Sequence, residues 1–430
     1  MEGSKQQDLE KDLMEMLKVV VLPELSNANE QCIYRVPPRI RQSNPKAYTP
    51  RVISIGPFHK PQGSGLDYNY LKPMEDLKLK YLKGFLNRTN RSVVEFVAKL
   101  RELENRIRNC YSEPVHYNSN DFLKMILIDA CFIIEYFLRT RESEKWNEND
   151  PLRLKRRIAE DIVYDFILIE NQIPFFILEE IYNHACVKNE IPFFLEITFF
   201  YFQIFNPQRI THEVIVSPKH FTDLIRTFMM PSSLDSKLGE QVPRDEIKNL
   251  YSASQLREAG LVFDVSQSKC LLDLNFDGVK LKIPCLDVYE ETETQVRNII
   301  AFEQCHFLST STITQYIQIL NFLIDTEKDV EILVNKKIIV NWMGDTKAVA
   351  TMINNLTSDI VQYTFNSKYL DICNALNKLY ENPCNQHKAN LKHDYFNTPW
   401  KTASTAAAFV LLLLTLIQTI CSIISLFQGN

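Results

Sequence analysis

The chain has 430 residues, of which 45% are hydrophobic and 23% are charged, and its formal net charge is −5. This length is sufficient for one large core or two domains of ordinary size, and the apolar content excludes an intrinsically disordered chain. Because the charge is mildly acidic, the chain offers no basic surface for phosphates, and we expect no nucleic-acid partner.

Glycine is scarce, at 10 of 430 residues, which is about a third of the usual share of roughly 7%. Phosphate-binding loops and turn-rich β-sandwiches need residues that adopt positive φ readily, so both are disfavoured. The sequence contains no GxGxxG, GxxxxGK[ST] or GxSxG motif. These observations favour a mostly helical fold, and we expect no cofactor.

The 10 cysteines form no CxxC pair, and several lie in apolar runs, where cysteine behaves as a small hydrophobic residue. The first residues, MEGSKQQDLEKDL, lack the apolar core of a signal peptide. A reduced, cytosol-facing body without disulfides is therefore expected. Glycosylation sequons at Asn87, Asn90 and Asn355 would matter only if the body were translocated.

An amphipathic helix is predicted over residues 8–22, and a proline-rich arm follows it. Residues 37–61 contain six of the 19 prolines. Proline lacks a backbone donor and disfavours helix in the residue before it, so this arm is expected to run extended over a helical surface. Within the arm, VISIGPF alternates like a short strand or an extended clamp.

Helical patterns begin at residue 71. Ser92 and Glu95 have the spacing of a capping box, which predicts the start of one of these helices. Residues 122–138 are apolar on nearly every face, so this helix is expected to be central and buried.

The helical pattern over residues 152–170 ends at the sequence ENQIP. Pro174 stops one helix there, because it has no N–H and its ring clashes with the preceding turn, and it can begin the next helix. We predict a helix–helix corner. The Asn171 and Gln172 side chains are expected to hydrogen-bond to the backbone of the SIGPFH arm, which cannot satisfy its own polar groups.

The second half of the chain mixes helical and strand patterns. Residues 193–205 hold seven aromatic residues, which predicts a large buried mass. SASQLREAG (252–260) reads as a helix with a serine cap and a glycine stop. Asp277 and Gly278 separate two alternating segments, which predicts a β-hairpin. Helical patterns resume over 292–382.

The predicted fold is mainly α with a small antiparallel β-hairpin or sheet (α+β), plus one C-terminal transmembrane helix. No internal repeat is evident. The expected parts are an N-terminal helix and lead-in (1–36), the proline-rich arm with a helical core (37–230), a loop or linker (231–250), helices with a small sheet packed on the first part (251–382), a polar spacer (383–401) and a transmembrane tail (402–430).

The tail carries the clearest functional signal. Residues 406–427 are uncharged and would span about 33 Å as a helix, which matches a hydrocarbon core of about 30 Å. Lysines precede this span and no charge follows it, so the N-terminal body is expected on the cytosolic side of a plasma membrane or endomembrane. The lipid bilayer is thus an expected partner. The alternative is a buried C-terminal helix of a soluble protein.

Polar residues interrupt the span at four-residue spacing, as in Thr415 and Thr419 and in Gln418 and Ser422. They form a stripe that can either contact another membrane helix or hydrogen-bond to the helix's own carbonyls. The second of these is the commoner arrangement in membrane helices.

Segments along nearly the whole chain carry a family resemblance. They are YTPRVISIGPFHK (48–60), MEDLKLKYLKGFL (74–86), LENRIRNCY (103–111), FLKMILIDACFIIEYFL (122–138), DFILIENQIPFFILEEIY (165–182), SASQLREAGLVF (252–263), IPCLDVYEETETQVRNIIAFEQCH (283–306) and the C-terminal span. Together they resemble the plant domain-of-unknown-function 247 family. Departures are small: GPFH replaces GPYH, and LIENQIP replaces LLENQIP.

This resemblance implies a plant membrane protein with a single C-terminal span and no established enzymatic activity. Some grass members of the family are implicated in pollen self-incompatibility, which suggests recognition or signalling. The residues that would discriminate such a role are unknown, so the resemblance does not assign it to this chain.

Acidic residues are the main catalytic candidates. Asp161 and Asp165 are four residues apart on a predicted helix face, Glu170 ends that helix, and Asp129 lies within the apolar helix. Buried carboxyl groups with shifted pKa values can supply acid–base catalysis. The favoured alternative is structural, because ion-pair networks also shift pKa values. The candidate basic partners are Arg108, Arg156 and Arg157.

His59 in GPFHK is a further candidate for a general base, but no serine or cysteine nucleophile neighbours it in the sequence, so a structural hydrogen bond to an acid is favoured. A zinc site would need four ligands in tetrahedral reach. The set Cys373, Cys384, His387 and His393 has irregular spacing, and Cys373 fits an apolar helix face. No metal site is expected.

Two functional hypotheses follow. The first is a membrane-tethered recognition or signalling module that acts through contacts with an unknown protein partner. The second is an enzyme, most plausibly a hydrolase that uses the region of His59, Asp129, Asp161 and Asp165. Converging acids in a concave polar site would favour the enzyme, whereas satisfied acids and exposed apolar surface would favour the module.

Overall fold

The computed structural model describes residues 11, 13–15, 30–60, 70–144, 146–185, 193–214, 217–231, 241–243, 250–361, 364–383 and 399–428. The expected helix 8–22, loop 231–250 and spacer 383–401 lie largely outside these residues. The chain forms two compact units. Unit 1 comprises Met1–Val36, Thr49–Tyr201 and Ile215–Phe221, and unit 2 comprises Pro37–Tyr48, Phe202–Val214 and Thr222–Asn430. The segment boundaries expected from sequence stay a prediction.

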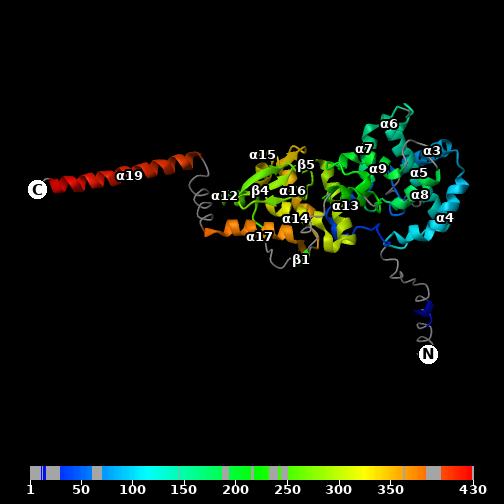
Figure 1. Ribbon diagram of the computed structural model, residues 1–430, viewed down its shortest axis with the longest axis horizontal. Coiled ribbons are helices and arrows are strands. Elements are labelled where there is room, and N and C mark those ends of the chain that lie inside the picture. Colours follow the sequence, from blue (N-terminus) through cyan, green and yellow to red (C-terminus); the bar gives the residue numbers. More distant parts are fainter. Residues whose placement is uncertain are drawn as a thin grey trace. The chain divides into compact units, whose positions relative to one another are not determined.

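Unit 1 is built around α5 (Ser119–Arg141). From Phe122 to Leu138 every residue of this helix except Lys124 is buried, because a helix that is apolar all round must lie inside. Helices α3, α4, α8 and α9 contact α5, and Figure 1 shows them in the same part of the ribbon. The helices of unit 1 are α3 (Lys72–Thr89), α4 (Val93–Asn109), α5, α6 (Pro151–Leu154), α7 (Arg156–Asp165), α8 (Phe175–Ala185) and α9 (Phe194–Tyr201).

Aromatic rings fill the space between α5 and its neighbours. Phe137 of α5 stacks on Tyr201 of α9, with the ring centroids 4.0 Å apart. A buried aromatic side chain of this kind stabilises the fold by about 2–3 kcal/mol through burial alone. The aromatic run 193–205 is largely buried, as expected, although Phe193 and Phe200 are exposed.

Local sequence signals set several boundaries in the way predicted. Ser92 and Glu95 form the expected capping box at the start of α4. At ENQIP, α7 ends at Asp165 and α8 begins at Phe175, so the predicted helix–helix corner is confirmed. The side chains at this corner are buried although three of them are polar.

The proline-rich arm divides between the two units. Its first half belongs to unit 2 and contains α2 (Pro38–Ser43) and the 3-10 helix η2 (Pro45–Tyr48). Asn298 of α13 donates to the carbonyl of Ala47 at 2.7 Å, and Arg297 donates to the Ser43 hydroxyl at 2.8 Å. Buried polar side chains of α13 therefore hold this half in place.

The second half of the arm lies in unit 1 and forms neither helix nor strand between residues 51 and 60. Ile53, Ser54 and Ile55 are buried within it. Gly56 has a φ of +71°, and a Cβ at this position would clash with the carbonyl oxygen of Gln172. The glycine thus allows the arm to approach the ENQIP backbone.

Unit 2 is mainly helical with short strands between the helices. Its longest buried helix, α13 (Glu290–His306), contacts α14, α16 and η2. Two strands interrupt the helical patterns predicted over 292–382. The remaining helical elements are η4 (Gln203–Phe205), η5 (His212–Val214), α10 (Phe221–Met229, whose first residue is assigned to unit 1), α12 (Ala253–Glu258), η7 (Leu308–Thr310), α14 (Thr312–Leu323), α15 (Glu327–Asn335), α16 (Thr346–Leu356) and α17 (Ser367–Glu381).

Three small sheets complete unit 2 in the described part of the chain. The predicted hairpin joins β3 to β4 through Asp277 and Gly278, and these strands are antiparallel. β1 and β7 are antiparallel, whereas β2 pairs with β4, and β5 pairs with β6, in parallel. A mainly α fold with little β structure is confirmed, with mixed strand directions. The strands are β1 (Gln241–Pro243), β2 (Val262–Ser266), β3 (Asn275–Phe276), β4 (Lys280–Pro284), β5 (Leu286–Val288), β6 (Ile339–Asn341) and β7 (Thr364–Asn366).

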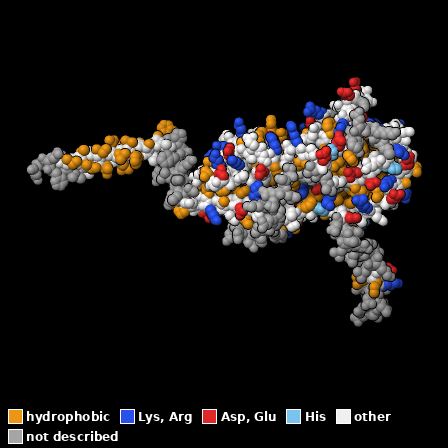
Figure 2. Space-filling model, in the orientation of Figure 1, with side chains coloured by type: hydrophobic (Ala, Val, Ile, Leu, Met, Phe, Trp, Pro, Cys, Tyr) orange, Lys and Arg blue, Asp and Glu red, His pale blue; other side chains and the backbone are white. Residues whose placement is uncertain are grey.

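The last helix, α19 (Pro399–Gln428), contains a stretch from Thr402 to Ser422 that is long and apolar enough to cross a membrane. None of the window that defines this stretch is buried against the rest of the structure, and Figure 2 shows hydrophobic side chains along it. Its polar groups hydrogen-bond within the helix: Thr415 donates to the carbonyl of Leu411, and Thr419 to that of Thr415, each at 2.8 Å. The back-bonded form of the polar stripe is the one observed.

Gly56→Ala should destabilise the chain by more than about 2 kcal/mol, because the new methyl group meets the Gln172 carbonyl and the residue must keep a positive φ. Gly344→Ala is the matched control, since Gly344 has a φ of +82° and nothing lies within 4 Å of the position that its new methyl group would take. It should cost only about 1 kcal/mol. Equal shifts of the two denaturant midpoints would contradict close packing of the arm on ENQIP.

Candidate functional site

The carboxyl group of Asp165 binds three consecutive backbone amides of the arm. Its oxygens accept hydrogen bonds from the N–H groups of Arg51, Val52 and Ile53 at 2.7, 2.7 and 2.8 Å. Asp165 is the last residue of α7 and is 1% exposed. Burial raises its pKa to about 7, against the opposing effect of the three amides. Asp165 therefore supplies the hydrogen-bond acceptors that a neighbouring strand would otherwise give to these amides.

Asn171 continues the same pattern. Its side-chain oxygen accepts from the Ile55 N–H at 2.7 Å, and its amide nitrogen donates to the carbonyls of Ile53 and Asp165 at 3.0 and 2.9 Å. The predicted bond from Asn171 to the arm is therefore confirmed. A side-chain amide suits this position because it both donates and accepts.

Gln172 makes different contacts from those predicted. Its side chain donates to the carbonyls of Phe166 and Leu168 at 2.6 and 2.7 Å and accepts from the Phe221 N–H at 3.0 Å. These groups come from the end of α7 and the start of α10, so the prediction that this side chain binds the arm is wrong. The physical reason is that the end of α7 leaves carbonyls without helical partners, and the Gln172 side chain satisfies two of them.

The carboxyl group of Asp129 in α5 binds one further backbone amide of the arm and a buried lysine. Its two oxygens accept from the Gly56 N–H at 2.9 Å and from Lys78 Nζ at 2.7 Å. Lys78 lies on α3, is fully buried, and also donates to the Ser54 carbonyl and to Glu75. Lys60, at the end of the arm, pairs with Glu75 as well. Two cations and two carboxylates thus balance around the arm.

His59 lies against Glu170, the first residue of ENQIP, with its Nε2 atom 3.1 Å from the carboxylate. Both side chains are buried, at 3% and 1% exposure. The other oxygen of Glu170 accepts from the Val36 N–H at 2.7 Å. His59 therefore contacts one of the candidate acids, Glu170, as the structural interpretation predicted.

Asp161 stands apart from this cluster. Its carboxylate meets the Arg51 guanidinium at 3.3 Å, on a partly exposed surface. The basic partners predicted for the acids are wrong in the cases that the structure shows: Arg108 pairs with Glu104, and Arg156 pairs with Glu160. Asp129 and Asp165 therefore bind the arm, His59 is part of it, and Asp161 lies at its edge.

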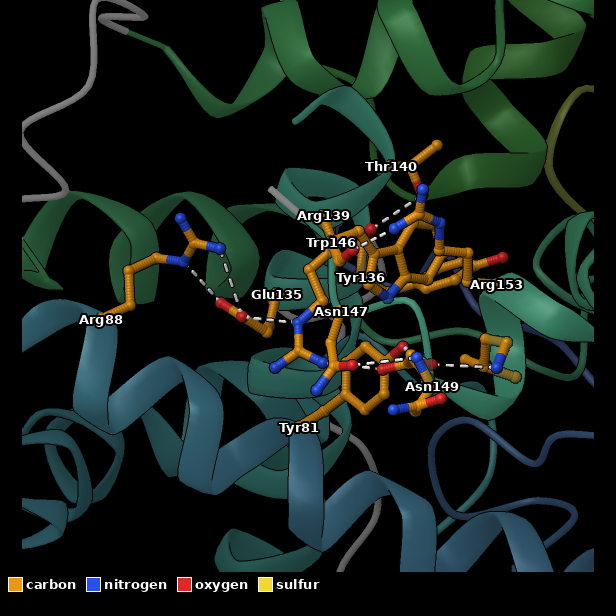
Figure 3. Close-up of polar contacts among 12 residues, drawn as sticks. Tyr81, Arg88, Glu135, Tyr136, Arg139, Thr140, Trp146, Asn147, Asn149 and Arg153 are labelled. Atoms are coloured by element: carbon orange, nitrogen blue, oxygen red, sulfur yellow. Dashed lines mark hydrogen bonds and ion pairs between the residues drawn. The ribbon is translucent and has the colours of Figure 1, made fainter. Parts of the chain in front are cut away.

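A second polar cluster connects α3 to α5, and Figure 3 shows how its side chains point toward one another. Glu135 of α5 pairs with Arg88 of α3 and with Arg139, each at 2.8 Å. Arg139 also pairs with Asp150 at 2.9 Å and lies over the ring of Tyr81, with its guanidinium carbon 4.2 Å from the centroid. This cluster joins two helices through buried and half-buried ion pairs.

Two residues of these clusters, Lys78 and Glu135, were not among the candidates, although each carries a sequence signal. Lys78 falls on the same helical face as Met74, Leu77 and Tyr81, so a lysine interrupts an apolar stripe. Glu135 lies within the apolar helix in the same way as Asp129. A charge on an apolar face predicts a buried partner, and it is the signal that would have found these residues.

The described residues contain no group of three or more His, Cys, Asp or Glu side chains that could hold a metal ion. Cys373 is buried in α17, and burial raises the pKa of its thiol to about 12. The other three residues of the weighed zinc set, Cys384, His387 and His393, lie outside the described residues.

The family described as DUF247, plant protein of unknown function, matches residues 33–414. The chain belongs to this family. The UPF0481 protein At3g47200 of Arabidopsis thaliana is 30% identical to it over 437 residues, covering 94% of this chain and 89% of that protein. The putative UPF0481 protein At3g02645 of the same plant is 23% identical over 497 residues, covering 92% and 90%. No solved structure matches the chain significantly.

In this DUF247 chain, Asp165→Asn should lower the free energy of unfolding by about 2–4 kcal/mol at neutral pH. An amide in place of the carboxylate points an N–H₂ group at one or more backbone N–H donors. Asp161→Asn is the matched control, because its partly exposed ion pair contributes less than about 1 kcal/mol. Equal losses in the two variants, measured by denaturant unfolding, would contradict the assigned role of Asp165.

The same variant should show a defined pH dependence. The folded pKa of Asp165, about 7, lies above the unfolded value of about 3.9. Between these pH values the folded chain binds a proton that the unfolded chain releases. Proton binding by Asp165 therefore stabilises the folded chain fully below about pH 4, and this stabilisation is lost as pH rises through about 7. The difference between wild type and Asp165→Asn should therefore be larger at about pH 5 than at about pH 8.

Proposed function

We propose that this plant protein is a membrane-tethered recognition or signalling module that acts through protein contacts, with its N-terminal body on the cytosolic side. The observation that carries the tether is the exposure of α19. Leu411, Leu412 and Leu414 in this helix are 64%, 69% and 56% exposed. A run of such residues is costly in water and favourable in hydrocarbon, so a bilayer is the environment that suits it.

The cytosolic orientation rests on charge and on an anchor residue. Lys388, Lys392 and Lys401 precede the apolar stretch in the sequence, and the chain carries no charged residue after Lys401. Positive charges favour the cytosolic side of a span. Trp400 is 85% exposed at the start of α19, where an aromatic ring can lie at the membrane interface.

An exposed aromatic pair in unit 2 supports a role in protein contacts. Trp342 follows β6 and Tyr289 precedes α13, and their rings stack with centroids 5.7 Å apart and planes 6° from parallel. They are 61% and 44% exposed. The Trp342 Nε1 donates to Asp287 at 3.0 Å, which fixes the ring at the surface. Rigid, exposed Trp and Tyr rings are enriched at the energetic centres of interfaces.

The arrangement of the acids supports a non-catalytic body over the hydrolase alternative. Both oxygens of Asp129 and of Asp165 are occupied by backbone amides or by Lys78. The candidate base His59 is 3% exposed and faces Glu170. A general acid or base must reach the proton of a bound substrate, and these groups reach the arm instead.

Membrane insertion can be tested with one charge. Leu413→Arg, near the centre of the stretch, should weaken insertion by about 3 kcal/mol and move protein from the carbonate-resistant membrane fraction to the soluble fraction. Leu413→Ile should leave the distribution between the two fractions unchanged.

The orientation of the body can be tested separately, because Asn87, Asn90 and Asn355 are exposed glycosylation acceptors. Glycosidase-sensitive sugar on these sites would overturn the cytosolic orientation, and its absence is expected.

The recognition role can be tested through the aromatic pair. A promiscuous biotin ligase fused to the N-terminus of the full chain, expressed in plant tissue, should label one or more proteins that Trp342→Ala no longer labels. Val279→Ala removes an exposed apolar side chain elsewhere in unit 2 and should keep the wild-type set. If Trp342→Ala and wild type label the same proteins to the same extent, this surface does not mediate recognition.

A further inference from the structure

Two cysteines of unit 1 lie beside a β-bridge. Ile33 and Tyr111 form an isolated parallel bridge, and the N–H groups of Cys32 and Ile33 both donate to the Cys110 carbonyl at 2.9 Å. Cys110 is the C-cap residue of α4 and has helical backbone angles, and its side chain is hydrogen-bonded to that of Cys32. Two thiols within hydrogen-bond distance lie close enough for a side-chain rotation to bring the sulfur atoms together, and the backbones beside them are already paired.

Both cysteines line a hollow of about 550 Å³, where their side chains are 3% and 5% exposed. Arg106 and Lys219 line the same hollow, together with Glu179 and other residues. The Arg106 guanidinium lies over the ring of Phe176, 3.9 Å from its centroid, which holds a positive charge at this wall. The hollow thus brings solvent to the wall that contains both cysteines, beside two cations and the three carboxylates of Glu30, Glu179 and Glu180.

The electrostatics single out Cys110. A hydrogen bond from the Cys32 side chain, with the charges of Arg106 and Lys219, lowers the pKa of the Cys110 thiol against the effects of burial and Glu30. In Cys131 and Cys373 burial is the largest effect, and it raises the pKa of the thiol. Cys110 is thus the better nucleophile, and Cys32 is placed to react with it next.

We propose that Cys32 and Cys110 form a peroxide-sensitive dithiol that closes to a disulfide. The Cys110 thiolate attacks one oxygen of hydrogen peroxide, the O–O bond breaks, and the departing hydroxide takes a proton to become water. The Cys32 thiolate then attacks the sulfur of the resulting sulfenic acid, and the S–O bond breaks as the S–S bond forms. Two thiols and one peroxide give one disulfide and two waters, and the thiols supply both electrons.

The disulfide would tie the segment before the arm to the end of α4. Val36 in this segment donates to Glu170, and Tyr111, beside Cys110, donates to the Gln172 carbonyl at 3.2 Å. Both segments that the disulfide would join therefore already contact the ENQIP corner, and oxidation would link them covalently. A reversible disulfide of this kind suits a body in a reducing compartment, where disulfides are transient and redox-sensing.

The test uses the full-length chain in detergent micelles, fully reduced, treated with hydrogen peroxide and then alkylated. Peptide mapping by mass spectrometry should recover a peptide that joins residues 32 and 110, has lost two hydrogen atoms and separates on reduction. Cys285→Ser is the control, since Cys285 is exposed and lies outside the hollow, and it should still give the linked peptide.

Two variants test the order of the steps. Cys32→Ser should accumulate sulfenic acid at position 110, detected with a cyclic dione probe, and Cys110→Ser should give neither the linked peptide nor probe labelling at position 32. Recovery of both cysteines as alkylated thiols after peroxide, pairing of either with another cysteine, or equal probe labelling in the two variants would overturn the proposal.

Discussion

The structure of unit 1 depends on how an arm without regular secondary structure satisfies its backbone. Buried N–H groups must find acceptors, and the arm has no neighbouring strand among the described residues to supply them. Asp165, Asn171 and Asp129 provide side-chain oxygens to five of its amides, those of residues 51, 52, 53, 55 and 56. These three residues come from α7, the ENQIP corner and α5, so the arm connects elements that are far apart in sequence.

The same constraint explains why so many charges are buried. A carboxylate inside a protein is costly unless it is paired and hydrogen-bonded, and Lys78 provides the countercharge for Asp129 while it also reaches the Ser54 carbonyl. An apolar replacement of this pair would leave the arm's amide and carbonyl groups without partners. The charged cluster therefore specifies where the arm lies, and the acids that first suggest catalysis have a structural use.

Sequence patterns predicted the elements whose causes are local. The buried α5, the Ser92 capping box, the Asp277–Gly278 hairpin and the ENQIP corner each follow from the periodicity or chemistry of neighbouring residues. The partners of the acids were not predictable in this way, because Asp165 binds amides more than a hundred positions away in the chain. Alternating residues likewise indicate a strand but not its neighbour, so the parallel pairing of β2 with β4 was not predicted.

Native-state hydrogen exchange of the arm amides is the most direct measurement of the central claim. Amides in an exposed, irregular segment exchange at rates near those of an unfolded chain, whereas amides bonded to buried acceptors exchange only when the structure opens. The structure predicts that Val52, Ile53, Ile55 and Gly56 are protected to nearly the same extent as the amides of α5. Fast exchange at these four amides while α5 stays protected would contradict the claim that side-chain acceptors hold the arm.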